Sequence, residues 1–181
     1  SYIQITSPEN YAGIAGTSYL VTGTGKGLFE NNVVVQVNDG NGNILFEQAV
    51  VMVTDEIGGE GEWSVEIDLG ELEAPTRIIV EAFSPDPSTG LNTALDNIQI
   101  NANSEFGLPY VEITSPVWNG AVNNSPIIVQ GMAGAAFENN IVVQILDHND
   151  ETNILAETFA TIQTDELAGS GPWTAEFDLA L

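Results

Sequence analysis

Residues Trp63–Leu69 read WSVEIDL, and apolar side chains alternate strictly with polar ones along this stretch. Residues two apart share a face in an extended strand, so Trp63, Val65 and Ile67 point to one side. A strand with one apolar and one polar face is typical of an antiparallel sheet packed on one side only. The stretch therefore predicts a β-fold in which its apolar face contributes to a core.

The same alternation returns in Trp173–Leu179, which read WTAEFDL, as part of a long internal repeat. Three further identities mark the repeat: ITSP at 5–8 and 113–116, FENN at 29–32 and 137–140, and VVQ at 34–36 and 142–144. A period of about a hundred residues makes each copy a domain, because solenoid units are much shorter. Leu181 aligns near Glu71. We therefore expect the second copy to lack roughly the last third of the first and to be unable to close its core alone.

Short alternating runs separated by turn residues dominate both copies, and helix patterns are nearly absent. The runs predict seven strands in the first copy and five in the second. The expected strands are 2–6, 17–22, 31–38, 43–53, 62–69, 76–84 and 95–101, then 110–114, 125–130, 140–147, 153–163 and 172–179.

Seven short strands in about a hundred residues indicate an antiparallel β-sandwich of immunoglobulin type, and a small barrel is the alternative. The predicted fold class is all-β: two tandem immunoglobulin-like sandwich domains, the second lacking its last strands. We expect domain 1 at residues 1–104, a short linker at 105–109 and domain 2 at 110–181.

The charge balance is extreme, with 26 acidic residues against one Lys and one Arg, for a net charge of -24. Phosphate binding requires clustered cations, so nucleic acid is excluded as a partner. An anionic membrane surface would repel the chain as well. Bound cations or high salt would relieve the self-repulsion, which makes a halophilic or calcium-rich setting plausible.

The chain has no Cys, which excludes disulfides, thiolate metal sites and Cys nucleophiles. Its longest apolar run is well short of the roughly 20 residues of a membrane span, so we expect no membrane insertion. Few Lys, many Asn, Thr, Ser and Gly, and tandem domains together favour an extracellular or cell-surface protein.

The repeated elements resemble the immunoglobulin-like domain of bacterial spore germination proteins, which also occurs in many other secreted bacterial proteins. The similar elements are an opening strand that ends in ITSP, the Phe-Glu-Asn step, a Val-rich strand, an Asp-x-x-Gly hairpin and a Gly-x-Trp strand. Both copies carry most of them, so the resemblance covers nearly the whole chain. It implies a β-sandwich and a non-catalytic accessory module with no established catalytic residues.

Two hairpin turns carry oxygen-bearing side chains at alternate positions, as the start of a calcium-binding loop does. The candidate ligands are Asp39, Asn41 and Asn43 in the first copy and Asp147, Asn149 and Glu151 in the second. Calcium takes about six to eight oxygens, and each turn offers three. Hairpin turns also favour Asp, Asn and Gly for backbone reasons alone. A bound Ca2+ and a plain turn are both open interpretations.

The three tryptophans divide into two kinds. Trp63 and Trp173 are in phase with the apolar face of their strands, so we expect core positions and not sugar-stacking platforms. Trp118 lies in a loop, aligns with Glu9 or Asn10 and has no aromatic counterpart in the first copy. Trp118 is a candidate for an interaction surface, and local packing is the alternative.

The missing last strands of the second copy predict a further interaction surface. Without them, apolar residues of its core strands are expected to stay partly uncovered beside free strand edges. These residues are Val143, Ile145, Phe177 and Leu179. An uncovered edge is a template for pairing with another chain.

The sequence has few residues of the types that enzymes use for catalysis. His148 is the single histidine and lies in the second hairpin turn, where an exposed turn residue is the default. Carboxylate pairs could serve glycoside hydrolysis, but that reaction also requires a cleft. We expect no enzyme activity and no catalytic residues.

Three functions follow as hypotheses. The first is a structural or assembly module of a bacterial surface protein or filament, joined by strand addition to protein subunits, expected to be copies of itself. The second is a calcium-dependent adhesion or glycan-binding module. The third is an accessory domain of a secreted enzyme.

Overall fold

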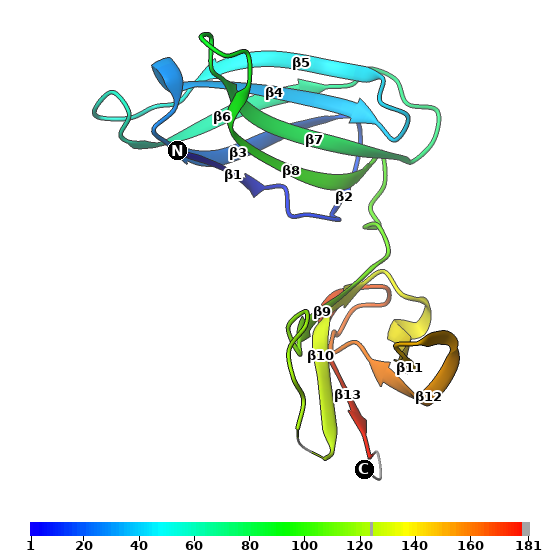
Figure 1. Ribbon diagram of the computed structural model, residues 1–181. Coiled ribbons are helices and arrows are strands. Elements are labelled where there is room, and N and C mark those ends of the chain that lie inside the picture. The colour runs from blue at the N-terminus through cyan, green and yellow to red at the C-terminus, as the bar shows by residue number, and fades with distance from the viewer. Residues whose placement is uncertain (124, 179–181) are drawn as a thin grey trace. The chain divides into compact units, whose positions relative to one another are not determined.

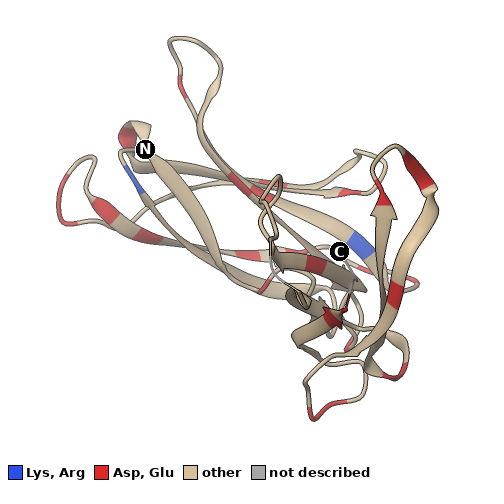
Figure 2. Cartoon of the chain, turned by 60° about the horizontal axis from the view of Figure 1, so that its bottom comes forward, with Lys and Arg blue, Asp and Glu red and all other residues tan. Residues whose placement is uncertain are grey.

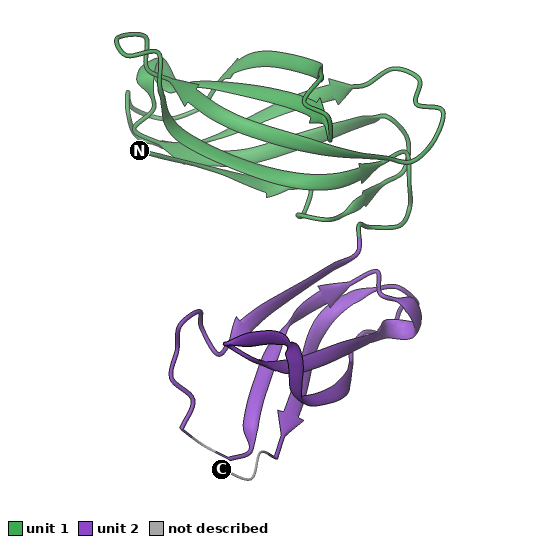
Figure 3. Ribbon diagram, turned by 45° about the vertical axis from the view of Figure 1, so that its right-hand side comes forward, with its two compact units in different colours: residues 1–108 green, residues 109–181 purple. Residues whose placement is uncertain are grey.

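The computed structural model describes residues 1–123 and 125–178, which fold into two compact units, Ser1–Leu108 and Pro109–Leu181 (Figure 3). In the described part of each unit, two separate sheets pack face to face. The predicted tandem immunoglobulin-like β-sandwiches are therefore confirmed, and the barrel alternative is wrong. Residues 105–108 of the predicted linker pack on unit 1, where the Leu108 N–H donates to the Tyr11 carbonyl at 2.8 Å.

Unit 1 combines a three-stranded and a five-stranded sheet (Figure 1). The smaller sheet has the order β1-β3-β6, with β1 at Tyr2–Ser7, β3 at Ser18–Lys26 and β6 at Glu60–Asp68. The larger has the order β2-β8-β7-β4-β5, with β2 at Gly13–Ile14, β8 at Asn92–Ala102, β7 at Thr76–Pro85, β4 at Asn32–Asp39 and β5 at Ile44–Val51. The β2–β8 pair is parallel, and the other pairs of unit 1 are antiparallel.

The core of unit 1 follows the alternation in the sequence. Trp63, Val65 and Ile67 of β6 are buried, and the residues between them are exposed. The Trp63 indole lies against the backbone of Gly23, where an added Cβ would be 2.2 Å from the ring. Its Nε1–H donates to the Thr24 carbonyl at 3.1 Å. Both tryptophans that share this phase, Trp63 and Trp173, are core residues as predicted.

The repeated Phe-Glu-Asn step forms a tight 3-10 turn in each unit, η1 at Phe29–Asn31 and η2 at Phe137–Asn139. Glu30 and Glu138 have φ values of 51° and 52°, in the left-handed region. This turn redirects the chain from one sheet to the other. The repeated sequence here therefore has a structural explanation.

Unit 2 is built from fewer strands. One sheet has the order β13-β10-β9, with β9 at Tyr110–Ser115, β10 at Ile127–Gly134 and β13 at Ser170–Phe177. The other pairs β11 at Asn140–Asp147 with β12 at Asp150–Thr161. The described residues of unit 2 include no counterpart of β2, β7 or β8.

The strand predictions differ from the structure at several places. Strand β3 continues to Lys26, past the expected end at residue 22, and β10 continues to Gly134, past the expected end at residue 130. The two-residue strand β2 was not expected, because it lies in a segment rich in turn residues and pairs only with Asn101 and Ala102 of β8. The expected strand 43–53 ends at Val51, and Val53 then forms an isolated bridge to Glu62 of β6. The chain crosses between the two sheets at that bridge.

Candidate functional site

Unit 2 exposes apolar residues on the side formed by β9 and the free edge of β11, which is called its open side here. Comparison of the two repeat copies identifies this surface. Ile3 and Ile5 of β1 are 6% and 7% exposed, whereas their repeat counterparts Val111 and Ile113 of β9 are each 59% exposed. Both pairs occupy the same alternating positions of their strands, on the side that faces the core in unit 1. The difference therefore arises from what packs against them.

In unit 1, strand β8 packs against β1. The Ile5 N–H donates to Asp96 Oδ2 of β8 at 2.8 Å. The loop after β1 also follows β8, because the Tyr11 N–H donates to the Gln99 carbonyl at 2.6 Å and the Gln99 N–H donates to Asn10 Oδ1 at 2.8 Å. Together β7 and β8 close this side of the sandwich.

The second difference lies in the larger sheet. In unit 1, β4 has a partner on each side, and Gln36 is opposite Glu47 of β5 and Glu81 of β7. In unit 2, β11 pairs with β12 alone among the described strands, so Gln144 is opposite only Glu157. The other edge of β11 presents backbone N–H and C=O groups that no described strand receives.

A groove of about 370 Å³ opens at this place, between β9 and β11. Its floor includes Val129 and Val143, and one wall carries Ile113. The loop after β9 forms the other part of the rim. That loop contributes Pro116, Val117, Trp118, Asn119 and Gly120. Three of its apolar residues, Ile113, Val129 and Val143, correspond in the repeat to Ile5, Val21 and Val35, which are buried in the core of unit 1.

The four residues that were predicted to stay partly uncovered differ in their exposure. Val143 and Phe177 are buried, so the expectation that they stay uncovered is wrong for these two. The described strands β10, β11 and β13 pack closely enough to enclose them without further strands. Ile145 is half-buried. Leu179 lies outside the described residues. The exposed core positions are instead Val111 and Ile113, which sequence reasoning missed.

Trp118 is 92% exposed and lies on the rim of the groove. With the constant offset of 108 residues between Phe29 and Phe137, Trp118 takes the place of Asn10, the residue that contacts β8 in unit 1. The predicted contact residue is therefore beside the open side of unit 2.

A second exposed apolar cluster lies on the outer face of β11 and β12. Phe137, Val142 and Phe159 are exposed and line a hollow of about 480 Å³. Val142 is opposite Phe159 in the strand register. Sequence reasoning missed this cluster, although its signal was readable: Val142 is apolar at a position where the alternation calls for a polar residue.

The calcium candidates form compact hairpin turns. The Asp39 carboxylate accepts hydrogen bonds from the N–H groups of Asn41 and Asn43, both at 2.9 Å, and from the Asn43 amide at 2.7 Å. The bond from the Asn43 side chain is the main reason that the pKa of Asp39 is below its ordinary value. These bonds occupy both carboxylate oxygens and account for the turn without a metal.

The second turn is similar, since Asp147 Oδ1 accepts from the Asn149 N–H at 2.8 Å. Glu151 follows two residues later, in β12. No group of three or more His, Cys, Asp or Glu side chains in the described ranges is arranged to hold a metal ion. Calcium binding stays a prediction.

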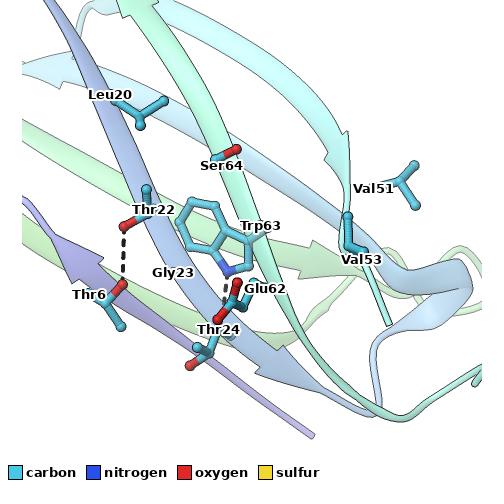
Figure 4. A pocket seen from close by; sticks show the side chains of 10 residues that line it. All are labelled: Thr6, Leu20, Thr22, Gly23, Thr24, Val51, Val53, Glu62, Trp63 and Ser64. Carbon is cyan, nitrogen blue, oxygen red and sulfur yellow. Dashed lines mark hydrogen bonds between the residues drawn. The ribbon is translucent and has the colours of Figure 1, made fainter. Parts of the chain in front are cut away.

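A groove of unit 1 lies over the outer face of β1, β3 and β6, with a volume of about 590 Å³ (Figure 4). It is lined by hydroxyls, among them Thr6 and Thr22, whose Oγ1 atoms are 3.2 Å apart and hydrogen-bonded. Glu62 is its one ionisable side chain. A single carboxylate without a neighbouring base does not form the paired groups that acid–base or nucleophilic catalysis needs.

Acidic side chains are spread over strands and loops of both units, whereas the two cations lie in unit 1 (Figure 2). Lys26 pairs loosely with Glu60 at 4.0 Å, and both side chains are exposed. Residues 109–178 contain ten acidic side chains and neither Lys nor Arg. None of the helices among the described residues has the length and apolarity to cross a membrane.

No curated protein matches the chain. A solved structure of β-glucuronidase from Bifidobacterium dentium, in complex with coumarin-3-O-glucuronide, is similar at 18% identity over 62% of this chain and 19% of that chain. The TM-score is 0.34, too low for the likeness to bear on activity.

The model of the immunoglobulin-like domain of bacterial spore germination, Gmad2, matches residues 2–91 and 110–180. The two matches cover both units and most of the chain. Such a domain suggests a non-catalytic accessory module. The chain belongs to this immunoglobulin-like family and contains two tandem copies of its domain.

Proposed function

We propose that the chain is a non-catalytic structural module of a bacterial surface protein or filament. Its subunits are joined by β-strand addition at the free edge of β11. The observation that carries the proposal is the contrast within the repeat: Ile5 is buried under β8, whereas Ile113 is exposed on the open groove of unit 2.

Strand addition fits the chemistry of this side. An added strand would hydrogen-bond to the free backbone groups of β11, and its inward side chains would enter the groove beside Val129 and Val143. Removing apolar surface from water contributes about 25 cal/mol per Å². The apolar lining therefore favours an occupant with aliphatic side chains at every second position.

The extracellular location and the identity of the partner belong to the same proposal. A chain without Cys, with a net charge of -24, is suited to an exposed position where salt screens its self-repulsion. We propose further copies of the same chain as the neighbouring subunits. Each would supply a strand to the next, and such a head-to-tail contact produces an open fibre.

Disulfide trapping tests strand addition directly, because the chain has no Cys of its own. The full chain would carry Gln144→Cys, and a peptide of residues 76–85, the sequence of β7, would carry Glu81→Cys. In unit 1, Gln36 and Glu81 are direct partners across β4 and β7. Cross-strand partners are close enough for a disulfide. We expect rapid crosslinking of the peptide to unit 2.

The internal repeat supplies a matched control. Gln36→Cys places the thiol at the equivalent position of unit 1, where β7 already occupies the edge. This variant should capture the peptide much more slowly. Equal capture by both variants, or none by Gln144→Cys, would overturn the proposal.

Glycan binding through Trp118 is a second candidate, because a nearly fully exposed loop tryptophan can stack on a sugar ring. A glycan array probed with the chain and with Trp118→Ala tests it. Array signals that vanish in the variant would support glycan binding. Signals that are absent, or that survive in the variant, would count against Trp118 as a sugar platform.

A further inference from the structure

We infer that Asn41 is a site of spontaneous deamidation, which converts its side chain to a carboxylate in the exposed turn between β4 and β5. An asparagine reacts in this way most readily when a glycine follows it, because no side chain shields the glycine nitrogen. The sequence contains two Asn-Gly steps, Asn41-Gly42 and Asn119-Gly120. The structure distinguishes between them.

The reaction requires only the chain, water and a base such as hydroxide. The Gly42 N–H first leaves the Asp39 carbonyl, to which it donates at 3.0 Å. The Gly42 nitrogen then loses its proton and attacks Cγ of Asn41, so that a new C–N bond forms while the bond from Cγ to the side-chain nitrogen breaks and ammonia leaves. Water opens the resulting five-membered imide at either carbonyl carbon, which gives aspartate or isoaspartate.

The surroundings of Gly42 leave room for this ring. Asn41 and Gly42 are exposed, and a Cβ added at Gly42 would meet no described atom within 4 Å. At the other step, a Cβ added at Gly120 would lie 2.8 Å from the Val117 carbonyl oxygen. The Gly120 N–H also donates to that oxygen, at 2.8 Å. Asn41 should therefore react before Asn119.

The neighbouring Asp39-Gly40 step offers the same ring closure but a poorer target. The hydrogen bond from the Asn43 side chain is the main reason that the pKa of Asp39 is below its ordinary value. Asp39 is therefore ionised at neutral pH, and a nucleophile attacks an ionised carboxylate much more slowly than a neutral amide. The amide of Asn41 is the reactive group of this turn.

Deamidation would reverse the contact between Asn41 and Asp39. The Asn41 amide now donates to Asp39 Oδ2 at 3.5 Å. A carboxylate in its place cannot donate, and it puts a second negative charge beside the first. Isoaspartate also adds a methylene to the backbone of a turn that the Asp39 N–H closes on the Asn43 carbonyl at 3.0 Å. Either product should loosen the turn.

The internal repeat supplies a control within the same chain. In the equivalent turn of unit 2, the Asn149 N–H donates to the Asp147 carboxylate, as the Asn41 N–H does to Asp39. Asn149 is followed by Asp150, not by glycine. Asn149 should therefore keep its amide under conditions in which Asn41 loses it.

Mass spectrometry of the full chain tests the site after incubation at mildly alkaline pH, folded and, in parallel, unfolded in urea. We expect the folded chain to lose the Asn41 amide, with both aspartate and isoaspartate formed, and to keep Asn149. In urea, Asn41 and Asn119 should react at similar rates. Loss of the Asn41 amide only in urea would overturn the inference, and so would loss of the Asn119 amide ahead of Asn41 in the folded chain.

Asp150→Gly transfers the reactive step to unit 2, because it places a glycine after Asn149. The variant should lose the Asn149 amide while folded. An unchanged Asn149 would contradict the role given to the following glycine.

Asn41→Asp tests the consequence for the turn, and Asn41→Ser is its matched control, because serine lacks the amide donor but adds no charge. Amide hydrogen exchange of Asp39 and Asn43 should be faster in Asn41→Asp than in Asn41→Ser. Equal exchange in the two variants would overturn the predicted loosening by charge.

Discussion

Ile5 and Ile113 show at the scale of one residue how the two units differ. The side chains are identical and share the same phase of a β-strand, but Ile5 is buried and Ile113 is exposed. Ile5→Thr should lower the free energy of unfolding of unit 1 by about 2 to 3 kcal/mol, since it removes buried apolar atoms and buries a hydroxyl.

Ile113→Thr should change the stability of unit 2 by less than about 1 kcal/mol, because the side chain already contacts water. Urea unfolding followed by amide exchange in β3 and in β10 measures the two units separately. A large loss of stability from Ile113→Thr would mean that the open side of unit 2 is closed in solution.

Gly23 permits the close approach of Trp63. A Cβ at this position would lie 2.3 Å from the Gln4 carbonyl oxygen and against the indole, and neither group can move away. Gly23→Ala should therefore destabilise unit 1 by about 3 kcal/mol. Gly40→Ala is the matched control, since nothing lies within 4 Å of its Cβ, and its effect should stay within about 1 kcal/mol. Thermal unfolding measures both, and similar effects of the two variants would contradict this packing.

Tyr19 buries a phenol whose oxygen has no hydrogen-bond partner among the described residues. Tyr19→Phe should raise the free energy of unfolding by about 1 kcal/mol, because an unsatisfied buried hydroxyl is removed.

Desolvation by burial also raises the pKa of Tyr19 above its ordinary value. The phenol of the unfolded chain ionises above about pH 10, whereas the buried phenol stays neutral. Ionisation therefore favours the unfolded chain, and the free energy of unfolding falls as the pH rises past that point. Urea unfolding at about pH 8 and about pH 11 should show a smaller loss for Tyr19→Phe than for the unchanged chain. An equal loss would mean that the folded phenol ionises freely.

At the scale of elements, strict alternation is what made the fold predictable. WSVEIDL and WTAEFDL gave the two core strands correctly, because side chains in a strand that is packed on one side must alternate. The short strand β2 escaped prediction, since two residues carry no periodicity. The sequence also could not show that Val143 and Phe177 become buried, because this depends on how closely three strands pack.

The open side of unit 2 was predictable in outline and not in detail. The alignment of the two copies predicted a free edge in unit 2, and β11 has one among the described strands. The exposed side chains could not be predicted, because their exposure depends on a contact between residues distant in sequence. In unit 1, β8 covers β1 through this contact. Only the packing of β8 against β1 in unit 1 identifies Val111 and Ile113 as the uncovered pair.

At the scale of the whole molecule, charge should control association. A net charge of -24 makes identical chains repel, and added salt screens that repulsion over about 10 Å at 0.1 M. Self-association by strand addition should therefore strengthen as sodium chloride is raised. Sedimentation velocity over a salt series measures it, and Gln144→Pro, which places a ring on β11 and removes its N–H, should reduce it. Association that weakens with salt would indicate attraction between charges instead.

Amide hydrogen exchange of β11 tests the central claim most directly, when it is measured on the isolated chain and on the assembly purified from its source. Backbone amides of Asn140–Asp147 that face away from β12 should exchange rapidly in the isolated chain and slowly in the assembly. Crosslinks to β11 in the assembly should come from a different subunit. Slow exchange of these amides in the isolated chain, or crosslinks to a following segment of the same polypeptide, would contradict assembly by strand addition.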